Sequence, residues 1–569
     1  MSFLPLLRWA PTFQQAYHHD LPVAVLGTKG LLGARIAMAG GHESCELKAG
    51  HSSGKVGPLE VHLRHELLDG HGVLKVELEA INSSAEEILV ELEFLSSARP
   101  SGAASIQKVH LPLTINGAFR HPALEGLGNH QIIDARRHVG PAETFAAHYL
   151  EPLATEDGVH ETTAQLFIPL ITLVEEGNPL CASLFATPEH PWRIAHHGEH
   201  RGESYWSLTA RVKIAAGETL REQAFLQLHE GGPAEAWRTF HQLAHREPHA
   251  PIEWLQSVRV HYYDFLSGTA PDGPRGGGYR ADAERFREFG VGLATQHGYY
   301  PYWGDYLHPD RKEWLAMPGD VRGPARMSIE EMRQRISLTR RQGARAAVYI
   351  HLAGFDDASP LWDSLRDAQR IRSDGTPVPF PWDGPDIARK AHFMSISAPA
   401  WSSHLLQQAY WIFELLDPDA IVVDETFAGM GYDFHPSRSG IVSSAMIGFM
   451  KALRDVARSF GPEKAVLTSD CGLASFCLWA DGEGGDHAYP GILGHPEYLR
   501  EPVRFLAALG GKPWLPCAWL WRAQWENQID LARKVGAGIG VANGHYDHSG
   551  LAHLLPDSRA GYLRDLANR

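Results

Sequence analysis

Cysteine, net positive charge and long apolar runs are all scarce in this sequence of 569 residues. The five cysteines show no CxxC spacing, which excludes a zinc ribbon and a disulfide framework and predicts reduced, mostly buried thiols. No window approaches the roughly 18 consecutive apolar residues that a membrane-spanning helix requires. The sequence therefore predicts a soluble chain with a reduced interior.

Basic residues are fewer than acidic residues, 52 against 67, and the formal net charge is −15. A surface of this sign lacks the basic stripe that neutralises phosphates, so we expect neither a nucleic-acid partner nor an anionic membrane partner. A neutral substrate suits it better. The N-terminal segment lacks the charged and apolar regions of a signal peptide, which predicts a cytoplasmic location.

The spacing of apolar residues differs between the two parts of the chain. In residues 59–95 and again in 164–174 and 205–228, apolar and polar residues alternate, as in antiparallel sheet with one wet face. We therefore predict an N-terminal β-sandwich over residues 1–232. Residues 233–250 follow with helical spacing and Pro233 at the first helical position, which predicts a linker helix.

Beyond Pro251, short strand-like runs alternate with amphipathic helical segments. Eight such runs can be counted, beginning with "SVRVHYYDF" and ending with "GAGIGVANG". Repeated βα units of this number predict a (β/α)8 barrel over residues 251–569. An open doubly wound sheet is the alternative, and it is weakened because no strand is followed by GxGxxG or GxxxxGK[ST].

Polar and aromatic residues collect where the predicted strands end, which is where barrel enzymes carry their chemistry. Carboxylates and aromatic rings without a cofactor motif suggest glycoside hydrolysis, because this reaction needs two carboxyl groups and flat faces that hold sugar rings. Neither a metal nor an organic cofactor is then required. The candidate substrate-binding residues are Tyr302, Trp303, Asp305, His351, Glu425, Asp470, Trp521, Arg522 and His545.

"AIVVDETFAGMGYD", residues 420–433, presents two adjacent carboxylates after an apolar strand. Asp424 is the candidate nucleophile; the alternative is a solvated cap on the following helix. Glu425 points the other way if the pleat continues, which predicts that it supports Asp424 from behind.

The partner acid is sought in "CLWADGEGGDHAYP", which carries Asp481, Glu483 and Asp486 on a glycine-rich segment. Asp481 follows three apolar residues as Asp424 does, so it is favoured, with Glu483 as the alternative. A turn rich in Asp and Gly is also the ordinary place for solvated acids.

The aromatic segment "HGYYPYWGDY", residues 297–306, is too dense to be all core. It predicts a stacking platform for sugars, although several rings could instead seal the top of the barrel. Trp519, Trp521 and Arg522 are interpreted in the same way.

Two other function classes remain open from the residues alone. His487, His495, His545 and His548 could serve a metal-dependent hydrolase, although 33 histidines make chance pairs common. A non-catalytic carbohydrate-binding protein would keep the aromatic platform and lack a working acid. Sandwich-plus-barrel enzymes often associate, so a homo-oligomer is allowed, but no feature of the sequence marks an interface.

The order of domains resembles the α-glycosidases of the α-galactosidase and raffinose-synthase type, and the related dextranase and cycloisomaltooligosaccharide-synthase type. "DAIVVDETF" is similar to their fourth-strand segment, and "LWADGEGGD" to the sixth-strand segment of the α-galactosidase type. The resemblance implies an N-terminal β-sandwich, a catalytic (β/α)8 barrel and an oligosaccharide or glycoside substrate.

The resemblance also implies roles for particular residues. Asp424 would be the nucleophile of a retaining mechanism and Asp481 the acid/base. The dextranase type has a glutamate as its acid, which keeps Glu483 as the alternative. The α-galactosidase type has a lysine two residues before the nucleophile, whereas this sequence has Val422, so the identity of the sugar stays open.

Overall fold

The structure is a computed structural model, and the description below is limited to part of the chain. The described residues are 33–38, 44–47, 52–68, 72–98, 107–112, 132–134, 144–150, 166–175, 179, 181–200, 203–245, 250–264, 278–316, 326–380, 391–469, 475–485, 510–519, 529–530, 532–533, 536–542, 561, 563–565 and 567–568. The chain divides into two compact units: Met1–Glu151 with Ala164–Pro248, and Pro152–Thr163 with His249–Arg569.

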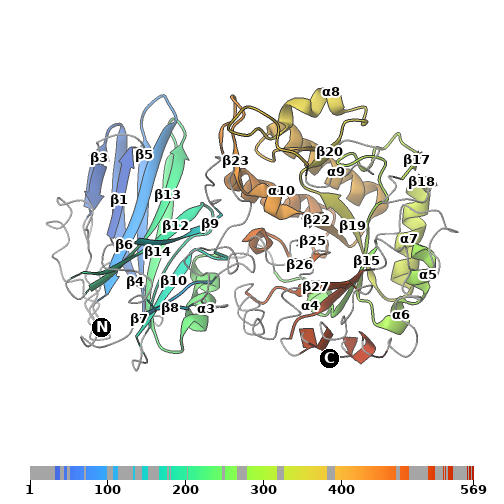
Figure 1. Ribbon diagram of the computed structural model, residues 1–569, viewed down its shortest axis with the longest axis horizontal. Coiled ribbons are helices and arrows are strands. Elements are labelled where there is room, and N and C mark those ends of the chain that lie inside the picture. The colour runs from blue at the N-terminus through green and yellow to red at the C-terminus, as the bar shows by residue number, and fades with distance from the viewer. Residues whose placement is uncertain are drawn as a thin grey trace. The chain divides into compact units, whose positions relative to one another are not determined.

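The first unit contains two antiparallel sheets, which confirms the predicted sandwich (Figure 1). Among the described residues, one sheet has in spatial order β2 (Ser44–Leu47), β1 (Gly33–Met38), β6 (Ile88–Ala98), β13 (Glu203–Ile214), β12 (Trp192–His200) and β9 (Thr144–Tyr149). The other has β3 (Ser52–Val56), β4 (Leu59–Leu68), β5 (Val73–Asn82), β14 (Thr219–His229), β11 (Cys181–Ala186), β10 (Leu170–Glu175), β7 (Gln107–His110) and β8 (Ile132–Asp134).

Alternation of apolar and polar residues explains the strands of this unit. In β4, Leu59, Val61 and Leu63 are buried while their neighbours are exposed or half-buried. Asn82 closes the turn after β5: its amide nitrogen donates to the carbonyl of Ile214 at 3.0 Å, and its Oδ1 accepts from the backbone of Ser84 at 3.0 Å. A short polar side chain thereby satisfies backbone groups that the turn leaves unpaired.

Helix α3 (Pro233–Leu243) forms where the sequence predicted a linker helix. It packs on the strands β10, β11 and β14 of the first unit. Thr239 accepts a hydrogen bond from Gln227 of β14 at 2.9 Å, and the ring of Phe240 lies 6.1 Å from that of Phe185. The helix is therefore part of the packed sandwich unit.

The second unit is built on a closed barrel of eight parallel strands, as predicted. In order around the barrel they are β15 (Val260–Asp264), β16 (Leu293–Gln296), β19 (Arg345–His351), β22 (Ala420–Asp424), β25 (Ala465–Thr468), β26 (Gly482–Gly485), β27 (Trp514–Trp519) and β28 (Ile539–Ala542). Short two-stranded pairs lie outside it: β17 (Glu313–Leu315) with β18 (Arg326–Ser328), β20 (Gly354–Asp356) with β21 (Ala391–Phe393), and β23 (Tyr432–Asp433) with β24 (Gly440–Ile441).

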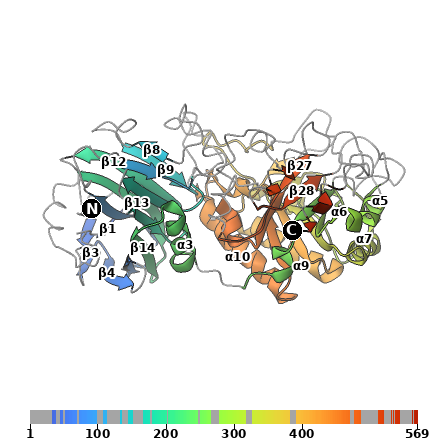
Figure 2. The same ribbon diagram turned by 90° about the horizontal axis from the view of Figure 1, so that it is seen from below.

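Helices cover the outside of the barrel (Figure 2). Those of the described residues are α4 (Glu253–Gln256), α5 (Tyr279–Glu284), α6 (Phe286–Phe289), α7 (Ile329–Arg341), α8 (Trp362–Leu365), α9 (Pro399–Leu416) and α10 (Ser443–Ser459), with 3₁₀ turns η4 (Arg366–Ala368), η5 (Thr426–Gly429) and η6 (Ser475–Trp479). Helix α7 packs on β19 and α10 on β25. None of the helices in the described part of the chain has the length and apolar character needed to cross a membrane.

Local sequence explains where the long helices begin and end. The hydroxyl of Ser328 accepts from the backbone of Glu331 at 3.0 Å, so it caps α7, and Arg340 and Arg341 lie in the last turn, where positive charge is favoured. Helix α9 begins with Pro399 and ends before Asp417, which adopts a left-handed φ of 52°.

The interior of the barrel can be identified from contacts between strands that are not neighbours. A side-chain carbon at Gly484 of β26 would lie 3.0 Å from the Nδ1 atom of His261 on β15, and β27 and β28 separate these strands in the barrel. Both positions therefore face inward. By alternation, Glu483 faces outward toward the helices.

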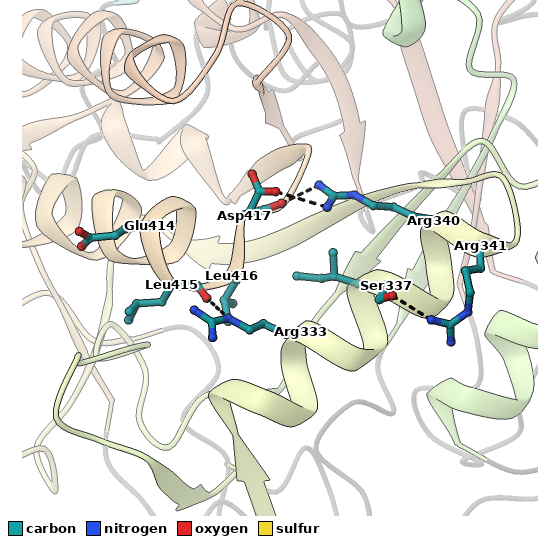
Figure 3. A pocket seen from close by; sticks show the side chains of 9 residues that line it. Arg333, Ser337, Arg340, Arg341, Glu414, Leu415, Leu416 and Asp417 are labelled. Atoms are coloured by element: carbon teal, nitrogen blue, oxygen red, sulfur yellow. Dashed lines mark hydrogen bonds and ion pairs between the residues drawn. The ribbon is translucent and has the colours of Figure 1, made fainter.

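A pocket lies between the ends of α7 and α9 (Figure 3). Arg340 pairs with Asp417 there, and Arg333 donates to the carbonyl of Leu415 at 2.6 Å. The pocket-lining ends of both helices directly precede β19 and β22 in the chain, so the pocket lies at the amino ends of the strands. This is the opposite end from the one where barrels carry out chemistry.

His261 lies inside the barrel and gives a prediction about acid stability. Its side chain is fully buried, its Nε2 is 2.7 Å from the hydroxyl of Thr295, and burial lowers its pKa to about 3. In the unfolded chain a histidine titrates near 6.5, so below that pH only the unfolded state takes up this proton. The barrel should therefore lose stability as pH falls from about 6.5 toward about 3, by up to about 1.4 kcal/mol per pH unit from this group.

The variant H261Q keeps a polar partner for Thr295 but cannot titrate. Its free energy of unfolding, measured by urea denaturation between pH 7 and pH 4, should fall less steeply with decreasing pH than that of the wild type. Equal slopes for the two proteins would contradict the assignment of His261 as a buried neutral base.

Candidate active site

Asp424 is the last residue of β22, at the carboxyl end of the barrel, and its side chain is held by two hydroxyl groups. Tyr349 donates to Oδ2 at 2.9 Å and Ser469 donates to Oδ1 at 2.6 Å. Tyr349 lies on β19, and Ser469 directly follows β25, so the strands on both sides of β22 orient the carboxylate.

Tyr349 keeps its proton in this position. Burial raises the pKa of its phenol well above the ordinary value, and the negative charge of Asp424 raises it further. The hydroxyl is therefore a fixed donor toward Asp424. A carboxylate that is only 4% exposed needs such donors, because burying a charge without them is costly.

Aromatic rings from the barrel interior and from the loop after β16 pack around Tyr349 and His351. His297 lies 4.0 Å from Tyr349 between ring centres, and Tyr300 stacks on Tyr349 at 6.0 Å. Trp303 contacts His351 edge to face at 4.9 Å and Phe380 at 5.9 Å. Trp303 is half-buried, and its ring also lies 6.3 Å from that of Tyr349, the residue that donates to Asp424.

The predicted stacking segment, residues 297–306, is thus divided between two tasks. Tyr299 and Tyr306 are fully buried, and their hydroxyls donate to the carbonyls of Tyr349 and His351 at 3.1 and 3.2 Å. These rings are packed core. Trp303 fits the predicted platform, and Tyr302 is half-buried beside it.

Asp305 ends the aromatic segment and is engaged by the protein. Arg311 donates to both of its oxygens at 3.0 and 2.9 Å, and the hydroxyl of Ser359 donates to Oδ2 at 3.0 Å. Its side chain is 1% exposed. We therefore correct its predicted role: Asp305 holds the loop in place and does not present an oxygen to a substrate.

His351 and Glu425 form a second polar pair beside Asp424. Nε2 of His351 lies 3.0 Å from Oε2 of Glu425, and each side chain is 1% exposed. Nδ1 of His351 accepts from the backbone of Ala353 at 3.0 Å and of Gly354 at 2.8 Å. The proton of the imidazole therefore sits on Nε2, which lies beside Glu425 without the geometry of a hydrogen bond to it.

The prediction that Glu425 points away from Asp424 is wrong. It assumed a continued pleat, but Glu425 has a left-handed φ of 53°, which ends the alternation. Its carboxylate reaches His351, the residue paired with Asp424 in the parallel register of β19 and β22. The adjacent carboxylates of Asp424 and Glu425 thus both contact inward-facing residues of β19.

The favoured acid, Asp481, lies outside the site, and this prediction is also wrong. The predicted sixth strand begins later than expected, because residues 475–479 form the 3₁₀ turn η6 and β26 begins at Gly482. Asp481 therefore precedes its strand. Its carboxylate pairs with Arg454 at 3.0 Å and Arg458 at 2.5 Å on α10, and accepts from the backbone of Val466 at 2.8 Å.

Glu483 lies within β26 and is 1% exposed. Its side chain points outward from the barrel, because the neighbouring Gly482 and Gly484 both face inward. The alternative acid therefore does not face Asp424 either. The third acid of the segment, Asp486, lies outside the described residues.

Four predicted binding residues lie outside the described residues: Asp470, Trp521, Arg522 and His545. The histidines of the metal alternative, His487, His495, His545 and His548, lie there too. Within the described part of the chain, no group of three or more His, Cys, Asp or Glu residues could hold a metal ion.

Sequence reasoning missed Tyr349 and Ser469, the two donors to Asp424. Tyr349 stands two residues before His351 on the same strand, so alternation would have assigned it to the same inward face. Ser469 directly precedes Asp470, and the charged Asp470 was predicted as the binding residue at this strand end instead. In both cases a neutral hydroxyl was overlooked beside a titratable neighbour.

Comparison with known proteins places this geometry in a wider context. No family model and no curated protein matches the chain. Among solved structures, the GH36 alpha-galactosidase AgaA of Geobacillus stearothermophilus aligns with a TM-score of 0.60 at 12% identity, over 94% of this chain and 74% of that chain. This chain has the α-galactosidase fold.

Two further alpha-galactosidases align over most of the same length. AgaB of Geobacillus stearothermophilus has a TM-score of 0.61 at 10% identity, over 94% of this chain and 74% of that chain. TtGalA of Thermus thermophilus, in complex with stachyose, has a TM-score of 0.52 at 14% identity, over 91% of this chain and 99% of that chain. The α-galactosidase fold is thus shared across both units, at identities that establish the fold alone.

The position of Asp481 predicts a stability defect without a chemical one. In D481N the two arginines of α10 lose their buried carboxylate, which should lower the free energy of unfolding by about 3–5 kcal/mol. The folded variant should retain its catalytic constant within a few-fold. Urea denaturation and steady-state kinetics measure the two effects separately; a 10³-fold loss of rate at unchanged stability would contradict this assignment.

Proposed function

We propose that this protein is a retaining glycoside hydrolase that acts on α-linked sugars, with α-galactosides as the first class to test. The observation that carries the proposal is the Asp424 carboxylate, oriented by Tyr349 and Ser469 at the carboxyl end of a barrel strand. The half-buried Trp303, which packs against Tyr349, supports a sugar-binding role. Solved relatives in fold include AgaA variants with raffinose and with stachyose bound.

In the proposed first step, a carboxylate oxygen of Asp424 attacks the anomeric carbon. The bond from that carbon to the leaving oxygen breaks, and a general acid protonates the leaving oxygen. In the second step the deprotonated acid removes a proton from water, whose oxygen attacks the same carbon and releases Asp424. Tyr349 and Ser469 keep the attacking carboxylate in one orientation, which lowers the entropic part of the barrier.

We propose Asp486 as the general acid. Asp481 is bound by two arginines and Glu483 faces outward, so neither is positioned to protonate the leaving oxygen. Asp486 is the next acidic residue of the same segment and directly follows β26 in the sequence. The assignment of Asp486 rests on the sequence.

The residue that precedes Asp424 on the inward face of β22 bears on which sugar can bind. Val422 is fully buried and shares the face of Asp424, in register with Tyr349. It stands where the α-galactosidase type has a lysine, so this position is apolar. A panel of aryl α- and β-glycosides, with the anomer of the product followed by NMR, decides both sugar and stereochemistry.

The role of Asp424 predicts rescue by an external nucleophile. D424G should lose at least about 10³-fold in turnover of the best aryl α-glycoside. Azide, entering the space left by the side chain, should restore turnover and yield the β-glycosyl azide, detected by NMR. A variant with unchanged turnover contradicts the assignment of the nucleophile, and bound oligosaccharide without product in the wild type would instead indicate a carbohydrate-binding protein.

The role of Asp486 predicts a dependence on the leaving group. D486N should lose about 10²–10⁴-fold with substrates whose leaving group needs a proton, and far less with a dinitrophenyl glycoside, which leaves unaided. E483Q is the matched control from the same segment and should show no such difference. An equal loss with both leaving groups in D486N would rule out Asp486 as the acid.

A further inference from the structure

The pair His351 and Glu425 is not used by the proposed chemistry, yet its construction is specific. Both side chains are 1% exposed and their facing atoms are 3.0 Å apart. Each comes from the carboxyl end of a barrel strand, β19 or β22. The pair is therefore built into the same end of the barrel as Asp424.

The backbone makes His351 a donor in one fixed direction. Two amide groups, those of Ala353 and Gly354, donate to Nδ1, so a proton cannot reside there without facing both. Trp303 and Phe380 pack on the ring at 4.9 and 5.4 Å between centres, which holds its plane. Nε2–H is consequently a rigid donor beside Trp303.

Glu425 is brought to this donor by a strained backbone. A left-handed φ of 53° is unfavourable for a residue with a side chain. A residue that continued the pleat would avoid this cost and point its side chain the other way. The strain therefore indicates that the carboxylate is required on the side of Asp424.

A donor and an acceptor side by side match one particular kind of ligand group. A sugar hydroxyl both accepts and donates a hydrogen bond, so it can take the Nε2–H of His351 and give its own proton to Glu425. Asp424 cannot serve as that acceptor if it is the nucleophile. The pair supplies a second carboxylate for recognition next to the one used for attack.

We propose that His351 and Glu425 together recognise a single hydroxyl of the sugar ring bound over Asp424, and so act as a specificity determinant. This inference rests on the proposed glycoside hydrolase function. A site built to bind a hydroxyl rejects the analogue that lacks it by about 10⁴–10⁵-fold, because its own buried polar groups are then left unpaired.

The test combines single-site variants with substrates that each lack one hydroxyl of the glycone. The wild type should discriminate strongly against one deoxy glycoside in kcat/KM. E425Q should reduce that one discrimination ratio at least tenfold and leave the ratios for the other deoxy substrates unchanged. H351Q, which keeps a donor near the Nε2 position, should alter the same ratio and no other.

The chain offers a matched control in the first unit. Glu222 of β14 pairs with His190 at 2.5 Å and has a side chain that is 5% exposed. E222Q disturbs a buried carboxylate–imidazole pair of the same composition and should leave every deoxy ratio unchanged. A merely structural effect of E425Q would lower kcat/KM for all substrates alike, and that result would overturn the proposal.

Binding measurements keep this test separate from the hydrolase proposal. Titration calorimetry of the free sugar and its deoxy counterparts, on wild type and E425Q, reports recognition without turnover. If the wild type binds but hydrolyses nothing, the hydrolase proposal fails and the calorimetric ratios still decide the role of the pair. If each deoxy sugar lowers the affinity by the same factor in E425Q as in the wild type, the pair does not recognise a hydroxyl.

Discussion

A buried carboxylate must be given donors by the protein, and Asp424 shows how this requirement organises the barrel. Burying its charge is unfavourable unless hydrogen bonds replace the lost water. The donors come from the two strands that flank β22, so the carboxylate is also a contact between three strands. The tyrosine donor is in turn packed by His297 and Tyr300, which belong to the loop after β16. The geometry of the nucleophile is thus tied to a large part of the carboxyl end of the barrel.

Periodicity was enough to predict the architecture, because both units are dominated by regular alternation. The two-residue period of β4 and the helical spacing of residues 328–343 and 401–418 are strong signals, and α7 and α9 begin within three residues of these limits. Asp424 was predictable for the same reason: three buried aliphatics precede it without interruption.

The remaining site residues depended on details that periodicity does not carry. In residues 477–483 an apolar run suggested a strand, but Ser475–Trp479 turn as a 3₁₀ helix and the strand begins at Gly482. Since side chains alternate, a shift of this kind exchanges the faces and the ends at which residues lie. Asp481 moved from a presumed catalytic position to an ion pair with α10. The predicted direction of the Glu425 side chain was wrong for a different reason: it depends on a single backbone angle, which neither composition nor spacing indicates.

The glycines of β26 have a consequence for any redesign of this barrel. Gly484 leaves the space that His261 occupies from across the interior, so this part of the core is filled from the opposite wall. A larger residue introduced at Gly484 would meet the imidazole and the side chain of Leu515 at once. A side chain can therefore be introduced at Gly484 only together with smaller side chains at the facing positions His261 and Leu515.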